Sequence, residues 1–352
     1  MKDLKKQFRG SLLLSAAGDA LGYAVEFDRL REIQRMYGPE GIQSYDLSAA
    51  DHTAVFSDDT QMTLFTAEGL LFAAGRGDRP EKEYVWLAYM DWLTTQFEDA
   101  PEPFGQCRLL EERRMRHRRA PGNTCLGALR QGIMGTMEEP INHSKGCGGI
   151  MRISPCAMIH SDRTAAAVSA AEASALTHTH PLGYIPSATM AFILNSIFWR
   201  DETDMVKIVQ DAVSDTEEMF QGEADLPGYI ELMKKALRLA ENDRPDTENI
   251  RILGEGWIAD EAMAIAAYCA LRHPQDPSGV LRAAVNHDGD SDSTGAIAGA
   301  IVGALIGEDA VGNEWKEHLE LTDLIGSIAD DLYTAVADPE RLPAMYRKET
   351  AE

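Results

Sequence analysis

The spacing of apolar residues constrains the fold of this 352-residue chain more than any other feature. Leu64, Ala67 and Leu71 fall on one side of a helix, and the same interval of three or four residues recurs in segment after segment. Alternation of β-branched and polar residues, which marks half-buried strands, is almost absent. The pattern therefore predicts an all-α protein.

The helical period and the loop signals together predict the order of elements. We expect helices at residues 10–24, 60–74, 84–95, 124–134, 164–175, 186–198, 204–219, about 227–240, 259–273, 293–306 and about 320–337. We expect loops at residues 97–106, 135–150, 176–186 and 241–256. No repeat period or flexible linker divides the chain. This predicts one compact domain over residues 1–340 and a tail at 341–352, with fraying after Pro339.

Composition excludes several classes of protein. Apolar residues make up 44% and charged residues 26% of the chain, as in soluble globular proteins. The net charge of -24 argues against a surface that binds a nucleic-acid backbone. A small phosphate ligand, held through a metal ion and backbone amides, remains compatible with this charge. We therefore expect a small-molecule or protein partner and no nucleic acid.

The cysteines indicate a reducing environment. The chain has five, which are scattered and form no C-x-x-C pair: Cys107, Cys125, Cys147, Cys156 and Cys269. This usage argues against a disulfide scaffold and against a structural zinc site. We expect a cytoplasmic protein.

Two apolar stretches resemble export or membrane signals. The N-terminus begins with basic residues and an apolar run, but Asp19 interrupts the run before a convincing cleavage site. Residues 296–307 are apolar but too few to span a bilayer, which needs about 20. We expect neither a signal peptide nor a membrane span.

The stretch HDGDSDSTG, residues 287–295, places three aspartates in alternation: Asp288, Asp290 and Asp292. A calcium-binding EF-hand loop starting at Asp288 would need glycine at Ser293 and glutamate at Gly299, so that interpretation fails. One aspartate at a helix start is explained by N-capping. Three exceed what one cap needs, and hard oxygen ligands for magnesium, manganese or calcium explain the excess.

A second acidic helix start strengthens the metal interpretation. Ser57, Asp58 and Asp59 open the apolar helix expected at 60–74, where Asp58 and Gln61 could form a capping box. Alone, this cluster is explained by capping. Together, the two clusters favour two helix N-termini that meet in the interior and hold two divalent ions, with Asp288 as a neighbour of the site.

Two further acids stand in the segment GDALGYAVEF. Glu26 is either a surface residue just past a helix end or a partly buried carboxylate with a shifted pKa, suited to proton transfer. Asp19 is either an acceptor behind the site or a helix-end acid, and we favour a structural role.

Two loops carry other candidate groups. SKGCGGIMR, residues 144–152, is a tight turn or a glycine-rich loop whose amides approach a phosphate, although it lacks the Walker spacing. THTHPLGY, residues 177–184, has an H-x-H pair. That pair could bind zinc, but no partner ligand stands nearby, and a packed loop histidine is the alternative.

Seven segments, in this order, make the chain resemble the ADP-ribosylglycohydrolase family: GDALGYAVEF, SDDTQMTLFTAEGLL, APGNTCLGAL, SKGCGGIMRISP, THTHPLGY, GEGWIADEAMAIA and NHDGDSDSTGAIAG. They span residues 10 to about 307. The resemblance implies a compact orthogonal helical bundle with a central cleft that holds a binuclear magnesium or manganese centre.

The resemblance also implies roles for particular residues. The metal ligands would be Ser57, Asp58, Asp59, Asp290, Asp292 and Ser293. Glu26, Asp59 and Asp292 would be catalytic, with Glu26 as a mobile glutamate near the metals. The substrate-binding residues would be Gly146, Gly148, Gly149, Met151, His178 and Trp257, with Trp257 under the adenine. Cys147 stands where other branches have asparagine, so hydrogen bonding from that position differs.

The implied activity is metal-dependent hydrolysis of the bond between ADP-ribose and an acceptor. We expect the acceptor to be an arginine of a protein, with serine or a small conjugate as alternatives, and the enzyme to be a monomer or weak dimer. Two other functions stay open. One is an HD-type metal phosphohydrolase, for which His287 and Asp288 supply the dipeptide. The other is a non-catalytic module that binds ADP-ribose.

Overall fold

The computed structural model describes residues 3–97 and 107–348. Within these ranges the chain is helical and forms no strand, only the isolated bridges Ala54–Leu319 and Gly146–Ile258. The α-helices are α1 (Leu4–Tyr23), α2 (Leu30–Tyr37), α3 (Asp58–Arg76), α4 (Glu81–Thr94), α5 (Asn123–Arg130), α6 (Ser154–Ile159), α7 (Arg163–Ala175), α8 (Pro181–Trp199), α9 (Met205–Met219), α10 (Leu226–Ala240), α11 (Asp246–Leu253), α12 (Ala259–Arg272), α13 (Pro277–Val285), α14 (Ser291–Ile306) and α15 (Thr322–Ala337). The 3-10 helices are η1 (Arg108–Glu111), η2 (Arg113–Met115), η3 (Cys147–Arg152), η4 (Glu308–Ala310), η5 (Asn313–Trp315), η6 (Pro339–Arg341) and η7 (Ala344–Tyr346).

The expected all-α class and the long helices are confirmed, and the differences lie in short elements. The loop expected at 241–256 contains α11, and the loop at 176–186 ends early because α8 begins at Pro181. The helices α2, α6 and α13 were also missed. Each has nine or fewer residues, so it offers too few turns for its apolar period to stand out. Most of the loop expected at 97–106 lies outside the described residues.

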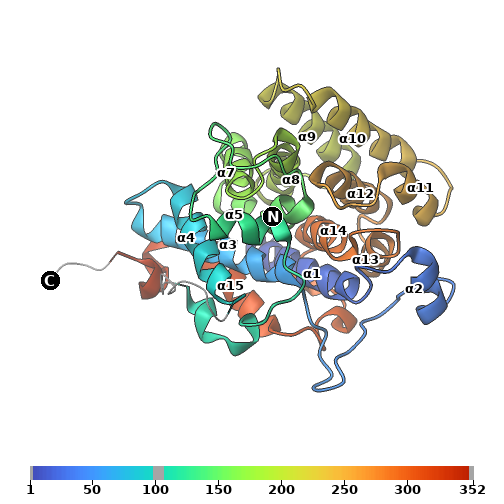
Figure 1. Ribbon diagram of the computed structural model, residues 1–352, viewed down its shortest axis with the longest axis horizontal. Coiled ribbons are helices and arrows are strands. Elements are labelled where there is room, and N and C mark those ends of the chain that lie inside the picture. The colour runs from blue at the N-terminus through green and yellow to red at the C-terminus, as the bar shows by residue number, and fades with distance from the viewer. Residues whose placement is uncertain (1–2, 98–106, 349–352) are drawn as a thin grey trace.

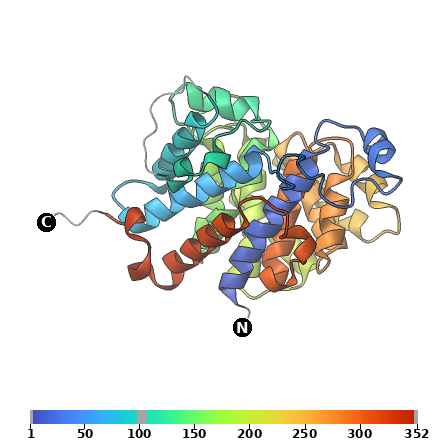
Figure 2. The ribbon, with the colours of Figure 1, turned by 90° about the horizontal axis from the view of Figure 1, so that it is seen from below.

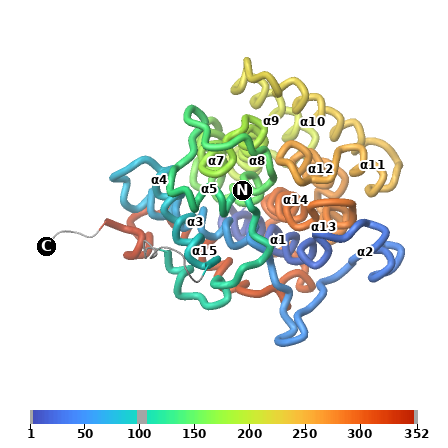
Figure 3. Tube along the Cα trace, in the orientation of Figure 1, coloured from blue at the N-terminus to red at the C-terminus, as the bar shows by residue number. Residues whose placement is uncertain are grey.

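Helices α1 and α14 run side by side through the middle of the molecule (Figures 1 and 3). Glycines let their backbones touch: a Cβ built on Gly18 would stand 2.1 Å from the Gly295 carbonyl oxygen, and one on Gly303 would stand 2.2 Å from that of Gly10. The pairing is antiparallel because early residues of α1 meet late residues of α14. The start of α14 therefore lies beside the end of α1.

The other helices surround this central pair. Helices α3 and α15 pack next to α1, and α12 and α13 pack against α14. Figure 2 shows α1, α3 and α15 as neighbouring rods, whereas α9, α10 and α11 form an outer edge in Figure 1. This arrangement places the N-termini of α3 and α14 toward the same interior region.

Helix α8 is long and apolar enough to cross a membrane by length and composition. However, 94% of its most apolar 18-residue stretch is buried inside the protein, as in the core helix of a globular protein.

The last described residues pack against the body of the protein, which corrects the expected fraying after Pro339. Tyr346 is fully buried, and its hydroxyl donates a hydrogen bond to Glu68 Oε1 at 2.8 Å. A Cβ on Gly75 would stand 2.2 Å from the Tyr346 carbonyl oxygen. The chain is therefore anchored at least to Tyr346.

Candidate functional site

The N-terminus of α3 brings the first acidic cluster into the interior. Ser57 is the N-cap, and its Oγ accepts a hydrogen bond from the Asp59 amide at 3.1 Å. Asp58 and Asp59 occupy the first turn and are both buried. The capping box expected between Asp58 and Gln61 does not form, because the Gln61 amide oxygen accepts a hydrogen bond from Trp92 Nε1 at 3.1 Å.

Asp19 fixes this helix start from the neighbouring helix α1. Its carboxylate accepts hydrogen bonds from the amides of Ser57 at 2.8 Å and Thr60 at 2.9 Å, and from the Thr60 hydroxyl at 2.5 Å. The side chain is fully buried. Asp19 is thus an acceptor behind the acidic helix start, and these hydrogen bonds tie α3 to α1.

The N-terminus of α14 brings in the second cluster. Asp290 is the N-cap, and its Oδ1 accepts a hydrogen bond from the Ser293 amide at 3.3 Å. Asp292 Oδ1 accepts from the same amide at 2.9 Å. Asp288 turns elsewhere and accepts a hydrogen bond from the Leu30 amide at 2.8 Å, at the start of α2. Asp290 therefore caps α14, and Asp288 accepts a hydrogen bond at the start of a different helix, α2. Capping does not explain the buried Asp292.

The two clusters face one cavity of about 630 Å³. It is lined by Glu26, Phe27, Asp58, Asp59, Arg118, Ala120, Pro121, Gly122, Asn123, Thr124, Cys125, Gly146, Cys147, Gly148, Met151, His178, Trp257, Asp290, Asp292 and Ser293. Eleven of the thirteen residues expected in the site are in this set. The other two, Ser57 and Gly149, are not among the lining residues.

The carboxyl groups of the cavity are difficult to ionise together. Burial, followed by the charges of Asp290, Asp58 and Asp19, raises the pKa of Glu26 to about 9. Burial is also the main cause that raises the pKa of Asp58, Asp59 and Asp292 well above the usual range, and neighbouring carboxylates add to it. The buried oxygens Glu26 Oε2 and Asp59 Oδ2 have no hydrogen-bond partner. A positive charge placed among these groups would relieve their repulsion.

The chemistry of these donors fits a hard divalent cation, although no closed coordination shell is formed. Carboxylate and hydroxyl oxygens are ligands of magnesium and manganese. In residues 3–97 and 107–348, no three His, Cys, Asp or Glu side chains stand in an arrangement that could hold a metal ion. The unpartnered Asp59 Oδ2 is a donor that such a cation could use.

The glycine-rich loop forms another wall. The Cys147 amide donates to the Trp257 carbonyl oxygen at 3.2 Å, next to the bridge between Gly146 and Ile258. A Cβ on Gly148 would stand 2.9 Å from Cys125 Sγ and 3.0 Å from His178 Cε1, so a larger residue would require these side chains to shift. Cys147 Sγ donates a hydrogen bond to Asp290 Oδ2 at 2.8 Å, which links this loop to the acidic cluster.

Gly149 has a packing role instead of facing the cavity. A Cβ on it would stand 3.0 Å from the Gly183 carbonyl oxygen and 3.1 Å from Ser174 Cβ. It lets η3 lie close to the helices α7 and α8, and it is not among the residues that line the cavity.

The two histidines of the H-x-H pair separate. His178 is buried at the cavity wall, and its Nδ1 shares a hydrogen bond of 2.8 Å with Thr177 Oγ1. Burial and the Arg152 charge lower its pKa to about 3, so its ring is neutral. His180 instead caps α8 by accepting from the Leu182 amide at 3.0 Å. This separation removes the zinc interpretation of the pair.

Two parts of the cavity were not predicted from the sequence. One is the wall from Arg118 to Cys125, where the Gly122 amide donates to Asp58 Oδ2 at 3.3 Å. The segment APGNTCLGAL carried part of the family resemblance, and this was the available signal. The other is Phe27, the last residue of GDALGYAVEF, a segment that also carried the family resemblance.

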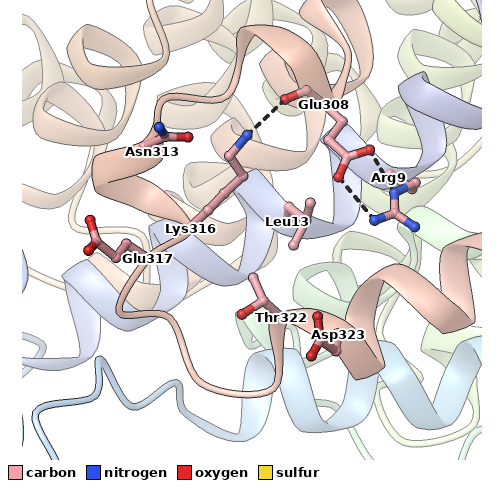
Figure 4. Close-up of a pocket in the computed structure, with 8 residues that line it drawn as sticks. All are labelled: Arg9, Leu13, Glu308, Asn313, Lys316, Glu317, Thr322 and Asp323. Atoms are coloured by element: carbon pink, nitrogen blue, oxygen red, sulfur yellow. Dashed lines mark hydrogen bonds and ion pairs between the residues drawn. The ribbon is translucent and has the colours of Figure 1, made fainter.

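A second cavity, of about 450 Å³, lies where the end of α14 meets α1 (Figure 4). Glu308 accepts two hydrogen bonds from Arg9, at 2.6 and 3.0 Å, and the Glu308 carbonyl oxygen faces Lys316 Nζ at 3.4 Å. Arg9 and Glu308 thus neutralise each other within the protein. The acidic cavity, with its unpartnered oxygens, is the stronger candidate site.

Known proteins provide an independent comparison. The sequence model of the ADP-ribosylglycohydrolase family matches residues 1–341. An uncharacterized protein of Archaeoglobus fulgidus is 25% identical over 345 residues, which cover 94% of this chain and 97% of that protein. The uncharacterized protein YegU of Escherichia coli strain K12 is 25% identical over 324 residues, which cover 88% of this chain and 91% of that protein.

A solved structure shares the fold. An ADP-ribosylglycohydrolase-related protein complex contains a chain with a TM-score of 0.67 and 22% identity, covering 96% of this chain and 100% of its own. Because the family match extends over nearly the whole sequence, the chain belongs to the ADP-ribosylglycohydrolase family.

Proposed function

We propose that this protein is a metal-dependent hydrolase that releases ADP-ribose from an acceptor by cleaving the glycosidic bond at the distal ribose. Family membership supports a hydrolase of this superfamily. The observation that carries the finer proposal is the convergence of carboxyl groups from the end of α1 and the starts of α3 and α14 on one cavity.

The residues proposed to hold two magnesium or manganese ions are Ser57, Asp58, Asp59, Asp290, Asp292 and Ser293. Such ions, when bound, orient ribose hydroxyls and lower the pKa of a bound water. Ser57 is not among the residues that line the cavity, and its Oγ already accepts one hydrogen bond, which makes it the weakest member of this set.

The proposed chemistry assigns distinct tasks to this chain's own side chains. Carboxylates around the distal ribose stabilise an oxocarbenium-like transition state by their negative charge. Glu26, whose pKa lies near 9 without a cation, holds a proton that its carboxyl can exchange with water or the departing group. Neutral His178 and the loop at Gly146 and Gly148 offer uncharged contacts for the rest of the ligand.

We propose ADP-ribosylated arginine on a protein as the acceptor, with serine-linked and small conjugates as alternatives. The decisive experiment measures hydrolysis of arginine-, serine- and O-acetyl-linked ADP-ribose with and without magnesium or manganese. The Asp58→Ala and Asp292→Ala double variant should release no ADP-ribose. Full activity of this variant would overturn the mechanism.

The position of His287 does not support the HD-type phosphohydrolase alternative, in which this residue would be a metal ligand. This residue is buried, and its Nε2 shares a hydrogen bond of 2.9 Å with Thr294 Oγ1. It is not among the residues that line the acidic cavity. Release of phosphate from nucleotides, without release of ADP-ribose, would restore this alternative.

The non-catalytic alternative is tested by pairing calorimetry with turnover. A binding module would take up ADP-ribose in the presence of manganese but leave every conjugate intact. We further propose that the protein acts as a monomer or weak dimer in the cytoplasm, where its five free cysteines stay reduced. Sedimentation at enzyme concentrations used in the assays tests the first of these points.

A further inference from the structure

Arg152, the last residue of η3, is a charged side chain that the proposed chemistry does not use. It is fully buried and forms no ion pair with a carboxylate in residues 3–97 and 107–348. Its guanidinium group lies over the Tyr89 ring, 4.2 Å from the ring centroid, and Nη1 faces Cys125 Sγ at 3.5 Å. A buried charge without an ionic partner is unfavourable, and an apolar side chain would fill the same space without that penalty. The charge is therefore better explained by what its hydrogen bonds hold in place.

The shortest of these hydrogen bonds leads to Thr177. Arg152 Nη2 donates to Thr177 Oγ1 at 2.7 Å and to the Ala173 carbonyl oxygen at 3.2 Å. Thr177 is fully buried, and its Oγ1 also lies 2.8 Å from His178 Nδ1. Within the described ranges its hydroxyl group forms no further hydrogen bond. A guanidinium group only donates, so Oγ1 accepts from Arg152, and the buried hydroxyl hydrogen has Nδ1 as its acceptor.

This direction decides where the His178 ring carries its hydrogen. Nδ1 accepts and is therefore bare, and the ring is neutral because burial and the Arg152 charge lower its pKa to about 3. The one ring hydrogen is then on Nε2. His178 lines the acidic cavity, and a Cβ on Gly146 or Gly148 would stand 3.5 or 3.3 Å from Nε2. Nε2 forms no hydrogen bond within the described part of the chain, so its hydrogen is available beside the glycine-rich wall.

We infer that Arg152 and Thr177 are positioning residues that hold His178 in its Nε2–H form, so that the cavity wall offers a hydrogen-bond donor to an oxygen of the ligand. The guanidinium group cannot accept a hydrogen bond, and this sets the direction of both hydrogen bonds that follow it. The inference rests on the proposed function for the ligand, whose phosphate and ribose groups both carry acceptor oxygens. If Arg152 and Thr177 only packed the core, their hydrogen bonds would have no effect on the ring.

Nitrogen NMR spectra of the ligand-free protein test the ring form without any substrate. At about pH 8, where ordinary histidines are neutral, His178 should show a bare Nδ1 and a hydrogen on Nε2. Its signals are assigned by their loss in His178→Gln. His180 is an internal reference, because its Nδ1 accepts from the Leu182 amide at 3.0 Å and must also be bare. A hydrogen on His178 Nδ1 in the wild type would overturn the inference.

Variants of Thr177 test whether this side chain sets the ring form. Thr177→Ser keeps the hydroxyl group and should leave the His178 signals unchanged. Thr177→Asp offers carboxylate oxygens that pair with Arg152 and accept from Nδ1, so the ring hydrogen should be found on Nδ1. If this variant does not fold, Thr177→Val keeps the shape without the hydroxyl group and should show both ring forms. A ring hydrogen that stays wholly on Nε2 in Thr177→Asp or Thr177→Val excludes a role for the hydroxyl group.

Arg152 is tested in the same spectra. Arg152→Gln removes the charge, and its amide can accept as well as donate, so the Thr177 hydroxyl group is no longer directed at Nδ1 and both ring forms should appear. Arg152→Lys keeps a group that only donates and should keep the Nε2–H form. The His180 signals should be the same in every variant. An unchanged His178 ring in Arg152→Gln would remove Arg152 from the scheme.

Calorimetry in the presence of manganese tests the donor against the ligand. ADP and ADP-ribose are titrated into the wild type, Thr177→Ser and Thr177→Asp, after the melting temperatures have been compared. Thr177→Asp leaves Nε2 as an acceptor that faces an acceptor oxygen, so affinity should fall by about tenfold or more, whereas Thr177→Ser should stay within about twofold of the wild type. A loss with both ligands assigns the contact to the diphosphate, and a loss with ADP-ribose alone assigns it to the distal ribose. Equal affinities in all three proteins, or no binding to the wild type, would overturn the donor role.

The two proposals fail in different ways. If no ADP-ribose conjugate is hydrolysed but the ring form and the ADP affinity respond as expected, the proposed function is wrong and the positioning role stands. If conjugates are hydrolysed but the ring form ignores Thr177 and Arg152, only the positioning role is wrong.

Discussion

Asp288 and Asp292 show how strongly the partner of one side chain decides its role. They stand four positions apart in the same acidic stretch, and the sequence gives both the same chemistry. Asp288 accepts a hydrogen bond from the Leu30 amide and serves the start of α2. Asp292 lines the cavity, where burial and the charges of Asp59 and Asp290 raise its pKa. The expected distinction between the two is therefore visible in their contacts.

This pair supplies a matched test of the acidic site. Asp292→Asn should lower ADP-ribose release by about 100-fold or more, since even partners behind a metal ligand cost 10–100-fold. Asp288→Asn makes the same chemical change outside the cavity and should retain activity within about twofold of the wild type. The measurement is kcat/KM at saturating manganese. Equal losses in both variants would mean that the cavity does not distinguish them.

Glu26 is expected to act on protons and not as a ligand of the cation. Glu26→Gln keeps the shape of the side chain but cannot exchange a proton, so kcat should fall by about 100-fold or more. Manganese affinity, measured by calorimetry, should change little. A large loss of manganese affinity in this variant would instead assign Glu26 to the metal.

At the scale of elements, the contact between α1 and α14 positions the site. Small residues bring the two backbones together at several turns, as at Gly18 with Gly295 and Gly10 with Gly303. The antiparallel pairing sets the start of α14, with Asp290 and Asp292, beside the turn that carries Glu26. Asp19 then ties the start of α3 to the same helix.

Substituting Gly18 by alanine tests this contact, and the same substitution at Gly127, a helical glycine without such a contact, is the control. A methyl group on Gly18 would clash with the Gly295 carbonyl group, so Gly18→Ala should reduce the free energy of unfolding by about 1–3 kcal/mol. Gly127 in α5 has no atom within 4 Å of its Cβ position. Gly127→Ala should therefore be neutral or stabilise by up to about 1 kcal/mol, because alanine favours helix. Urea unfolding compares the two, and a stabilising Gly18→Ala would contradict the close contact.

At the scale of the whole molecule, the buried acids link stability to pH and to cations. The folded protein raises the pKa of Glu26 from 4.5 to about 9, and it raises the pKa values of Asp58, Asp59 and Asp292 in the same direction. Between the unfolded and folded pKa values the native state binds more protons than the unfolded state. The stability of the cation-free protein therefore falls as pH rises through this window.

Thermal unfolding at several pH values tests this linkage. Without divalent cations the melting temperature should fall from about pH 5 toward pH 9 as these carboxyl groups are forced to ionise. Manganese should raise it, and more at high pH, because a cation binds the ionised form. The Asp59→Asn and Asp292→Asn double variant should show a flatter pH profile and a smaller response to manganese. If manganese raised the melting temperature equally at all pH values, the cation would not bind through these acids.

The long helices could be predicted from the sequence because each repeats its apolar spacing over three or more turns. The shorter helices α2, α6 and α13 could not, since each has too few turns for its apolar period to stand out. Helix α13 does carry a local start signal, because Asp276 accepts a hydrogen bond from the Gly279 amide at 2.9 Å and Pro277 follows it.

Residue type, spacing and order were enough to predict the helical class, the family and the acidic helix starts. Which residues share the cavity depended on how the helices pack. The tertiary structure moved Gly149 and His180 to packing and capping, retained His178, and added Phe27 and the Arg118 wall. The reason is that a cavity is built from helix ends far apart in the chain, and their meeting depends on backbone contacts such as that between Gly18 and Gly295.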